Sequence, residues 1–301
     1  MKMKSLLLAA ALFLPFALGA QEAQNAALAF TRIESNPRMA AFAGAGLASQ
    51  EADAWSAISG AARLSFLKEK GDAALGFQLW KPAVAVDKSI NFGGGAALRF
   101  GNLGVALAGT YDRSTVPYDG YCPNDLQLSL GLSYFLADAV SLGLNARYAS
   151  QHFSNDARVN GFSVDISALY VILPELTLAA TVGNVGPKVK GSGASFGQPS
   201  YARLGVAWNK VFAQKHGVEL LLDGEYNFGN TAAGALGVAY NYNRLVFVRA
   251  GYRLAGEKAL IPSHLGLGIG LQYAGFRADV SLLTASKMLG NTLNIGLGYS
   301  F

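Results

Sequence analysis

The sequence predicts an all-β fold: a transmembrane antiparallel up-and-down β-barrel of about 14 strands, with a short N-terminal helical hatch segment. Three observations predict it. From residue 72 onward, apolar residues alternate with small or polar ones at the period of a strand. Charged residues make up only 14% of the chain and hydrophobic ones 51%. Beyond the first twenty residues no apolar run reaches the length of a membrane helix, so a closed barrel is the remaining way for this chain to span a membrane.

Residues 1–20 have the order of a secretory signal peptide. Lys2 and Lys4 form a basic head, residues 6–18 are apolar apart from one proline, and small residues precede a polar stretch. We expect cleavage after Ala20, and therefore an exported protein. A retained N-terminal anchor is the alternative.

Residues 21–71 do not alternate, and we interpret them as a plug or hatch. Ala26–Arg32 and Glu51–Phe66 are compatible with helices, and Ser49 is placed to cap the second. The small residues between these stretches permit close packing against a barrel wall.

Residues 72–301 are predicted to form the barrel. The segment at 265–273 is typical: Leu, Leu, Ile, Leu and Tyr alternate with Gly, Gly, Gly and Gln. Many apolar faces finish in an aromatic residue, as membrane-interface girdles do. These are Tyr111, Tyr134, Tyr148, Tyr170, Trp208, Tyr226, Tyr240, Tyr252, Tyr273 and Tyr299.

The links between strands alternate in length, which indicates short periplasmic turns and long outer loops. The short links are at 101–102, 137–138, 173–175, 241–243 and 274, and the long ones at 112–124, 150–160, 184–200, 254–263 and 284–291. Two links depart from this pattern: 209–216 is longer than expected and 227–231 is shorter.

Charged residues recur on the face opposite the apolar one and are predicted to line the lumen. The candidates are Arg99, Arg147, Asp165, Arg203, Asp223, Glu225, Arg249, Arg277 and Asp279. Two interpretations stay open: an internal ion-pair network that holds the hatch, or a polar lining that selects a solute. A third, an active site, would use Asp223 and Glu225, which lie two apart on one face.

The last strand ends in Tyr299 and Phe301 on its apolar face, and a terminal aromatic strand resembles the recognition signal of the outer-membrane barrel assembly machinery. A secreted β-sandwich or propeller is the competing fold. It would leave one face of each sheet in water, whereas the second face here is rich in Gly, Ala and Ser, which suits a crowded lumen better.

Several function classes find no support. The three histidines are scattered, no metal-ligand spacing surrounds the single cysteine, and no nucleophile motif occurs, so we expect neither enzyme activity nor a metal or other cofactor. Without residues 1–20 the chain has 22 basic and 19 acidic residues, a net charge of +3, which gives no case for nucleic acid as a partner.

The N-terminal segment resembles the PorV/PorQ family, which is itself similar to the FadL-type fatty-acid channels. The resemblance is carried by the run Arg38–Ala48, which contains Gly44 and Gly46, and by Ala52-Asp53-Ala54-Trp55, followed by the barrel. It implies a hatch in which Gly44, Gly46, Asp53 and Trp55 take part. One departure is that Ser59-Gly60-Ala61-Ala62 stands where the family usually carries Asn-Pro-Ala.

The resemblance implies a location and a role. We expect a multi-pass protein of the bacterial outer membrane, in contact with its lipid. The favoured role is that of a type IX secretion accessory or cargo-attachment protein, with secretion-system subunits or secreted cargo as partners. The alternative is a FadL-like channel for uptake of a hydrophobic small molecule.

Overall fold

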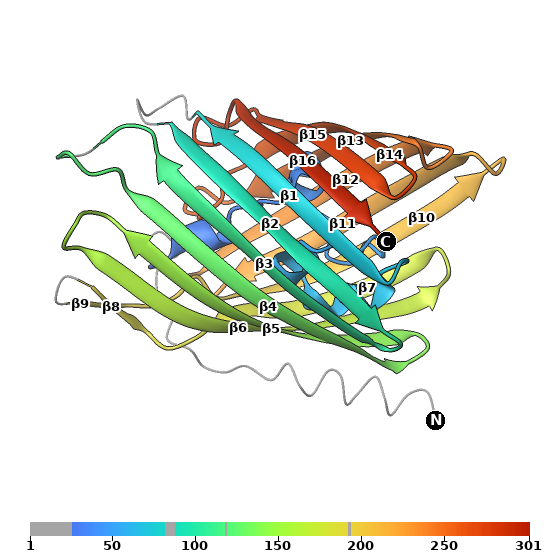
Figure 1. Ribbon diagram of the computed structural model, residues 1–301, viewed down its shortest axis with the longest axis horizontal. Coiled ribbons are helices and arrows are strands. Elements are labelled where there is room, and N and C mark those ends of the chain that lie inside the picture. Colours follow the sequence, from blue (N-terminus) through green and yellow to red (C-terminus); the bar gives the residue numbers. More distant parts are fainter. Residues whose placement is uncertain (1–25, 82–87, 118, 192–193) are drawn as a thin grey trace.

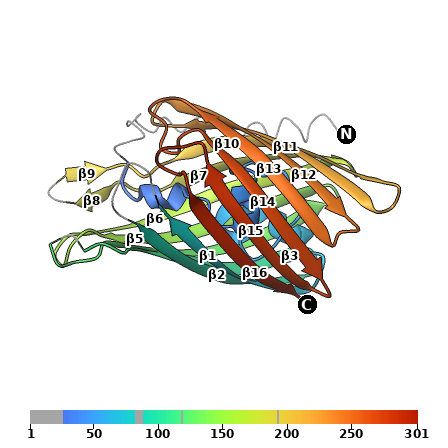
Figure 2. The same ribbon diagram turned by 90° about the horizontal axis from the view of Figure 1, so that it is seen from above.

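The computed structural model describes residues 26–81, 88–117, 119–191 and 194–301, and in it the chain forms a closed barrel (Figures 1 and 2). Fourteen antiparallel strands follow one another around the wall, β1 pairs with β16 to close it, and β8 and β9 form a separate small hairpin. The predicted fold class is therefore confirmed. The predicted signal peptide lies outside the described residues.

The strands are of membrane-crossing length. The wall consists of β1 (Gly71–Trp80), β2 (Ser89–Phe100), β3 (Leu103–Ser114), β4 (Asn124–Ala137), β5 (Val140–His152), β6 (Arg158–Leu173), β7 (Leu176–Val185), β10 (Tyr201–Phe212), β11 (His216–Asn227), β12 (Thr231–Tyr242), β13 (Val246–Ala255), β14 (His264–Tyr273), β15 (Phe276–Thr284) and β16 (Thr292–Ser300). The hairpin consists of β8 (Val189–Gly191) and β9 (Ala194–Phe196).

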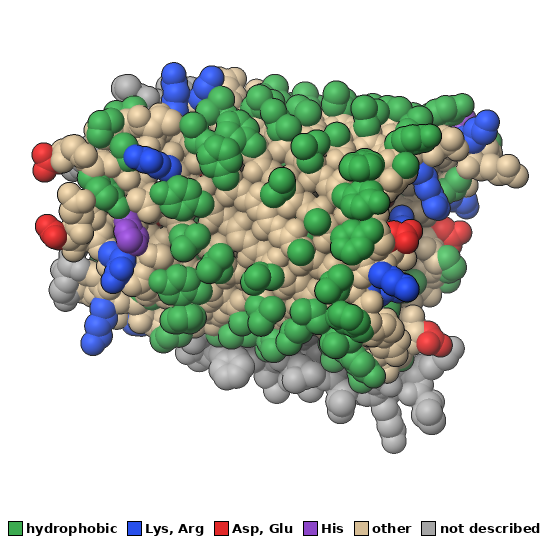
Figure 3. All heavy atoms as spheres, viewed as in Figure 1, with side chains coloured by type: hydrophobic (Ala, Val, Ile, Leu, Met, Phe, Trp, Pro, Cys, Tyr) green, Lys and Arg blue, Asp and Glu red, His purple; other side chains and the backbone are tan. Residues whose placement is uncertain are grey.

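The large apolar side chains point outward, the reverse of a soluble protein. On β12 Leu236, Val238 and Tyr240 are 59%, 44% and 42% exposed, whereas the residues between them are buried. Figure 3 shows hydrophobic side chains spread along one side of the wall and charged ones gathered at its two ends. An apolar belt of this extent needs lipid around it, because water would hydrate it only at a large cost in free energy.

The connections differ between the two ends of the barrel. At one end, here called the short-turn end, the links are 101–102, 138–139, 174–175, 213–215, 243–245 and 274–275. The expected long link at 209–216 is wrong, because β10 runs on to Phe212 and β11 begins at His216. At the other end, the long-link end, only 228–230 departs from the expected lengths.

The N-terminal segment is only partly helical. It contains η2 (Ala29–Arg32), α2 (Pro37–Ala41), α3 (Ser56–Ser59) and η3 (Ala61–Phe66). The predicted helix over Glu51–Phe66 is wrong, because it begins only at Ser56 and Gly60, with a φ of 146°, breaks it. No helix in the described ranges is both long and apolar enough to cross a membrane.

Candidate functional site

The N-terminal segment lies inside the barrel and fills much of the lumen, so we call residues 26–67 the hatch. Its first half packs Met39, Phe42 and Leu47 against inward residues of β6, β7 and β10 to β12. Its second half packs Trp55 and Leu64 against the inward faces of β1 to β3. The helices appear within the ring of strands in both views of the fold (Figures 1 and 2).

Glycines on the inward face make room for the hatch backbone. A Cβ added at Gly143 would lie 2.1 Å from the backbone nitrogen of Ala62, and one added at Gly251 would lie 2.2 Å from the carbonyl carbon of Phe42. Both distances are far below van der Waals contact. Inward glycines such as Gly143 and Gly251 therefore mark where the hatch backbone lies against the wall.

Asp223 on β11 holds the first half of the hatch. Its carboxylate accepts hydrogen bonds from the backbone N–H groups of Gly46 and Leu47, each at 3.0 Å, and pairs with Arg203 on β10. Arg203 also donates to the carbonyl of Gly44. The hatch presents these N–H groups because φ is positive at Gly44 and Gly46, which turns the chain back on itself.

Glu225, two residues along the same strand, forms a second anchor. Its oxygens lie 2.7 Å from Arg32 of the hatch and 2.7 Å from Arg253 of β13. Arg32 also lies over the ring of Tyr201, 3.5 Å from its centroid. One carboxylate thus joins the hatch to two strands.

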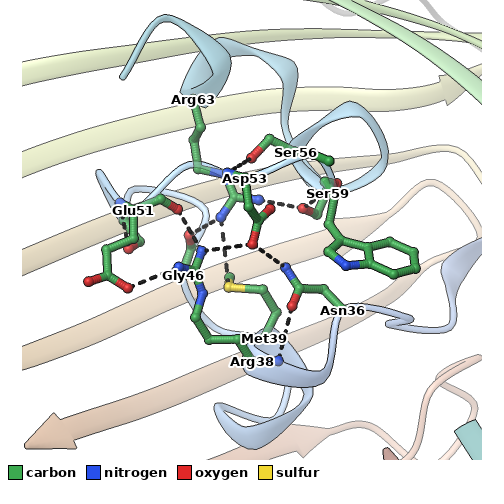
Figure 4. A network of polar contacts seen from close by, with 12 residues as sticks. Asn36, Arg38, Met39, Gly46, Glu51, Asp53, Ser56, Ser59 and Arg63 are labelled. Atoms are coloured by element: carbon green, nitrogen blue, oxygen red, sulfur yellow. Dashed lines mark hydrogen bonds and ion pairs between the residues drawn. The ribbon is translucent and has the colours of Figure 1, made fainter. Parts of the chain in front are cut away.

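The middle of the hatch contains its own polar network (Figure 4). Arg38 pairs with Glu51 at 2.9 Å and with Asp53 at 3.5 Å, and Asn36 donates to Asp53 at 3.2 Å. Burial alone would raise the pKa of Asp53, but the neighbouring charges of Arg38, Arg277 and Arg63 hold it below its usual value. Asp53 therefore stays ionised and ties the two halves of the hatch together.

Ser49 does not cap a helix, contrary to expectation. Its hydroxyl donates to Glu219 of β11 at 2.7 Å, and residues 51–55 do not continue into a helix. The residue is one more tie between hatch and wall.

The predicted lumen residues fall into several pairs. Arg147 pairs with Asp165 at 2.8 Å, Arg249 with Asp279 at 2.7 Å, and Arg277 with Asp72 at 2.9 Å. Arg99 is half-buried next to the short turn after β2, and no ion pair among the described residues includes it. The lining was predicted as one group, but the structure divides it into separate pairs.

The predicted hatch and end residues lie as follows. Gly44 and Gly46 form the turn bound to Asp223 and Arg203, and Asp53 accepts from Asn36. The ring of Trp55 fills the space over Gly76 and Gly93. Tyr299 and Phe301 are exposed at the short-turn end, with ring centroids 6.0 Å apart.

Four further residues of the network were missed from the sequence: Arg32, Asp72, Asn184 and Glu219. Asp72 accepts the N–H of Ala54 at 2.9 Å as well as pairing with Arg277. Asn184, with a φ of 54°, sits at an irregularity in the pairing of β6 with β7 and contacts Arg147, Asp165 and the hatch. For Asp72, Asn184 and Glu219 the sequence signal is a charged or amide residue on the inward face of a strand, whereas no strand pattern marks Arg32, which lies in the hatch.

The first residues of β6 extend beyond its pairing with β7 near the long-link end. β6 pairs with β7 only from Val164 onward, so Arg158–Ser163 have no strand partner on that side among the described residues, and the link after β7 lies beside them, with Gln198 donating to the carbonyl of Phe162 at 2.7 Å. An apolar cluster here joins the hatch, the wall and the β8–β9 hairpin: Leu28, Ala149, Val159 and Val189, with Ala27, Phe30 and Phe196 against them. We call it the mouth cluster.

The described residues contain no group of three or more His, Cys, Asp or Glu side chains placed to hold a metal ion. Asp223 and Glu225, which one interpretation treated as a catalytic pair, each face arginines and hatch groups. Their geometry is that of structural anchors.

No protein-family model and no curated protein matches the sequence. Solved structures do match. The toluene transporter TbuX of Ralstonia pickettii has a TM-score of 0.64 and 13% identity, over 88% of this chain and 98% of that one. The CymD monoaromatic hydrocarbon channel has a TM-score of 0.66 and 11% identity, over 89% and 97%.

A FadL homologue of Pseudomonas aeruginosa has a TM-score of 0.58 and 11% identity, over 89% of this chain and 98% of that one. At these identities the likeness concerns the fold, and none of these matches singles out the PorV/PorQ group. The closed ring of strands and the hatch inside it therefore form a FadL-like fold: a fourteen-stranded antiparallel barrel with short N-terminal helices inside.

Proposed function

We propose that this protein is a bacterial outer-membrane channel for small hydrophobic molecules, with its long-link end outside the cell. The mouth cluster is the observation that carries the proposal. It is an apolar cluster at the long-link end, next to the part of β6 that does not pair with β7, and it includes residues of the hatch. An apolar solute leaving water would gain most at such a place.

The fold neighbours support the same class of solute. TbuX is described as a toluene transporter and CymD as a monoaromatic hydrocarbon channel, and both share this architecture. They are transport proteins, in keeping with the expectation that this chain is not an enzyme. We therefore propose an uncharged aromatic or aliphatic molecule as the solute.

The test is uptake of radiolabelled toluene by cells that produce the protein as their only hydrocarbon channel. We expect Val159→Asn with Val189→Asn to reduce uptake at least fivefold, because two amides would replace apolar surface in the mouth cluster. Val116→Asn, an exposed valine of another long link, is the matched control and should leave uptake unchanged. Uptake that equals that of cells without the protein would contradict the proposal.

A secretion-accessory or cargo-attachment role of PorV/PorQ type is the second candidate. The observation that favours it is the firmly anchored hatch, since a barrel that only displays cargo needs no open passage. Co-purification with secretion subunits or cargo, combined with no hydrocarbon uptake, would replace the first proposal by this one.

A further inference from the structure

A hollow of about 530 Å³ opens on the outer face of the wall over β10 to β14, outside the lumen. Its rim consists of outward side chains that include Trp208, Leu222, Val238 and Tyr252. Its floor includes Ala250, Gly237 and Gly251. The hollow lies over Ala250, a small outward residue of β13 whose methyl leaves the space beside the larger Tyr252 and Val238 unfilled.

A hollow in a lipid-facing wall does not stay empty. Lipid chains are as apolar as leucine, so no hydrophobic effect drives them in, but an empty space would forfeit the dispersion contacts of its lining. The occupant is therefore a chain whose shape fits, and its residence depends on what holds the other end of the molecule.

The side of the hollow nearest the short-turn end is cationic. Lys210 follows Trp208 on the outward face of β10, about 7 Å further along the strand. Lys215 lies in the turn at 213–215 and Arg244 in the turn at 243–245. The two turns are neighbours, because the N–H of Asn243 donates to the carbonyl of Lys215 at 2.5 Å. No outward acid accompanies them on β10 to β13, because the three acids of β11 are directed to the lumen.

Aromatic groups complete this edge. His216 and Tyr240 lie between the hollow and the turns, with a ring nitrogen 2.7 Å from the hydroxyl oxygen. Aromatic rings at this height are typical of the headgroup region. The nearest acid is Glu175, whose carbonyl accepts the N–H of Asn209 beside Lys210, so this edge carries three cations and one acid.

We infer that this face binds one anionic phospholipid of the periplasmic leaflet. One acyl chain lies in the hollow and the phosphate lies against Lys210, Lys215 and Arg244. Charge complementarity selects the occupant, because the ammonium of a zwitterionic lipid offsets the attraction of its phosphate to three cations and a neutral hydrocarbon carries no charge. The inference needs the barrel to be in a membrane with its short-turn end in the periplasm, and it does not depend on hydrocarbon transport.

The experiment is native mass spectrometry of the whole barrel, delipidated in mild detergent and then offered equal amounts of phosphatidylglycerol and phosphatidylethanolamine. We expect one retained phosphatidylglycerol. Lys210→Gln with Arg244→Gln should weaken its retention at least tenfold and leave phosphatidylethanolamine unchanged. Lys68→Gln with Lys70→Gln, an exposed pair at the same end beside β1, is the matched control and should change nothing.

Filling the hollow tests the acyl chain. Ala250→Leu should reduce retention of both lipids, whereas Ala96→Leu, on the outward face of β2, should not. Heat-dependent migration in gels shows that each variant is folded, and Val238→Trp replaces Ala250→Leu if the latter does not fold. Equal retention of both lipids by the unaltered barrel, equal effects of the two charge-removing pairs, or displacement of the lipid by toluene or by a bound protein would each overturn the inference.

Discussion

The two halves of the hatch are held by different kinds of contact. The first half, residues 28–50, is anchored by charge on β10 to β13, through Asp223, Arg203 and Glu225. The second half, residues 54–67, rests on β2 to β6 through glycines and hydroxyls, with Ser141 donating to the carbonyl of Ala62 at 2.7 Å. Both halves also lie against wall glycines, as Phe42 does against Gly251, and Asp72 accepts the N–H of Ala54 in the second half, so the difference is one of degree: charged anchors are concentrated on the first half.

The charged strands and the glycine-rich strands contribute differently to the position of the hatch. A buried carboxylate that accepts two backbone N–H groups and an arginine defines one position for the turn that it binds, whereas a glycine face only permits approach. We therefore expect the charged side to determine where the hatch sits, and the glycine side to determine whether it fits.

The largest expected effect comes from Asp223→Ala. The substitution removes the carboxylate that pairs with the buried Arg203 and that accepts the N–H groups of Gly46 and Leu47, which costs about 3–5 kcal/mol. Urea unfolding in lipid vesicles, followed by tryptophan fluorescence, measures the loss. Asp223→Ala with Arg203→Met should lose less, since no isolated charge remains, and a strictly additive loss would contradict a coupled pair.

Gly143→Ala tests the second half. The added methyl would clash with the backbone of Ala62, and a backbone atom cannot move aside by changing a side-chain rotamer. We therefore expect the free energy of unfolding to fall by roughly 1–3 kcal/mol and protease to cleave the hatch faster. Gly224→Ala is the control, because nothing lies within 4 Å of its added Cβ. Equal stability of the two variants would mean that the hatch does not press on this wall.

Ser141→Ala should have a smaller effect. The hydroxyl donates to the carbonyl of Ala62, and its removal should cost about 1 kcal/mol. Ser163→Ala, at a buried position of β6 for which no comparable contact to the hatch is found, is a matched comparison. If both cost the same, the bond to Ala62 adds nothing to hatch stability.

Acid should produce the smallest change, and only at low pH. The pKa of Asp53 and the pKa of Glu51 are both held down in the folded protein, mainly because arginine charges outweigh burial. Their stabilising contribution is complete above the unfolded pKa values, near 4, and is lost as pH falls through the lower folded values. Hydrogen exchange of the hatch, after correction for intrinsic rates, should thus rise as pH falls below 4. Exchange that stays unchanged between pH 5 and 2 would contradict this assignment.

Much of the barrel was predictable from the sequence because alternation is a local signal. The alternation did not predict the end of β10 correctly, because Lys210 is a charged residue at an outward position. This last part of the strand extends past the apolar belt and therefore lacks the apolar residues that the pattern needs. The helix over Glu51–Phe66 failed because wall contacts, together with Gly60, override its helical composition.

The pairing of charges was not predictable. Asp72 and Arg277 meet only because β1 closes on β16, and Arg32 reaches Glu225 only because the hatch enters the lumen. Such partners lie far apart along the chain, and alternation says only that a residue faces inward. The pattern that determines the fold is therefore local in the sequence, whereas the ion pairs that anchor the hatch form only once the barrel has closed around it.

The most direct test of a hatch seated inside the lumen is cross-linking in a Cys122→Ser background, which removes the single native cysteine. Leu47→Cys with Gly205→Cys probes the charged side, and Ala57→Cys with Gly131→Cys probes the glycine side, since the relevant Cβ positions lie 3.0 Å and 3.3 Å apart. We expect both pairs to form disulfides in the exported protein. Free thiols in both pairs that react with a membrane-impermeant maleimide would contradict it.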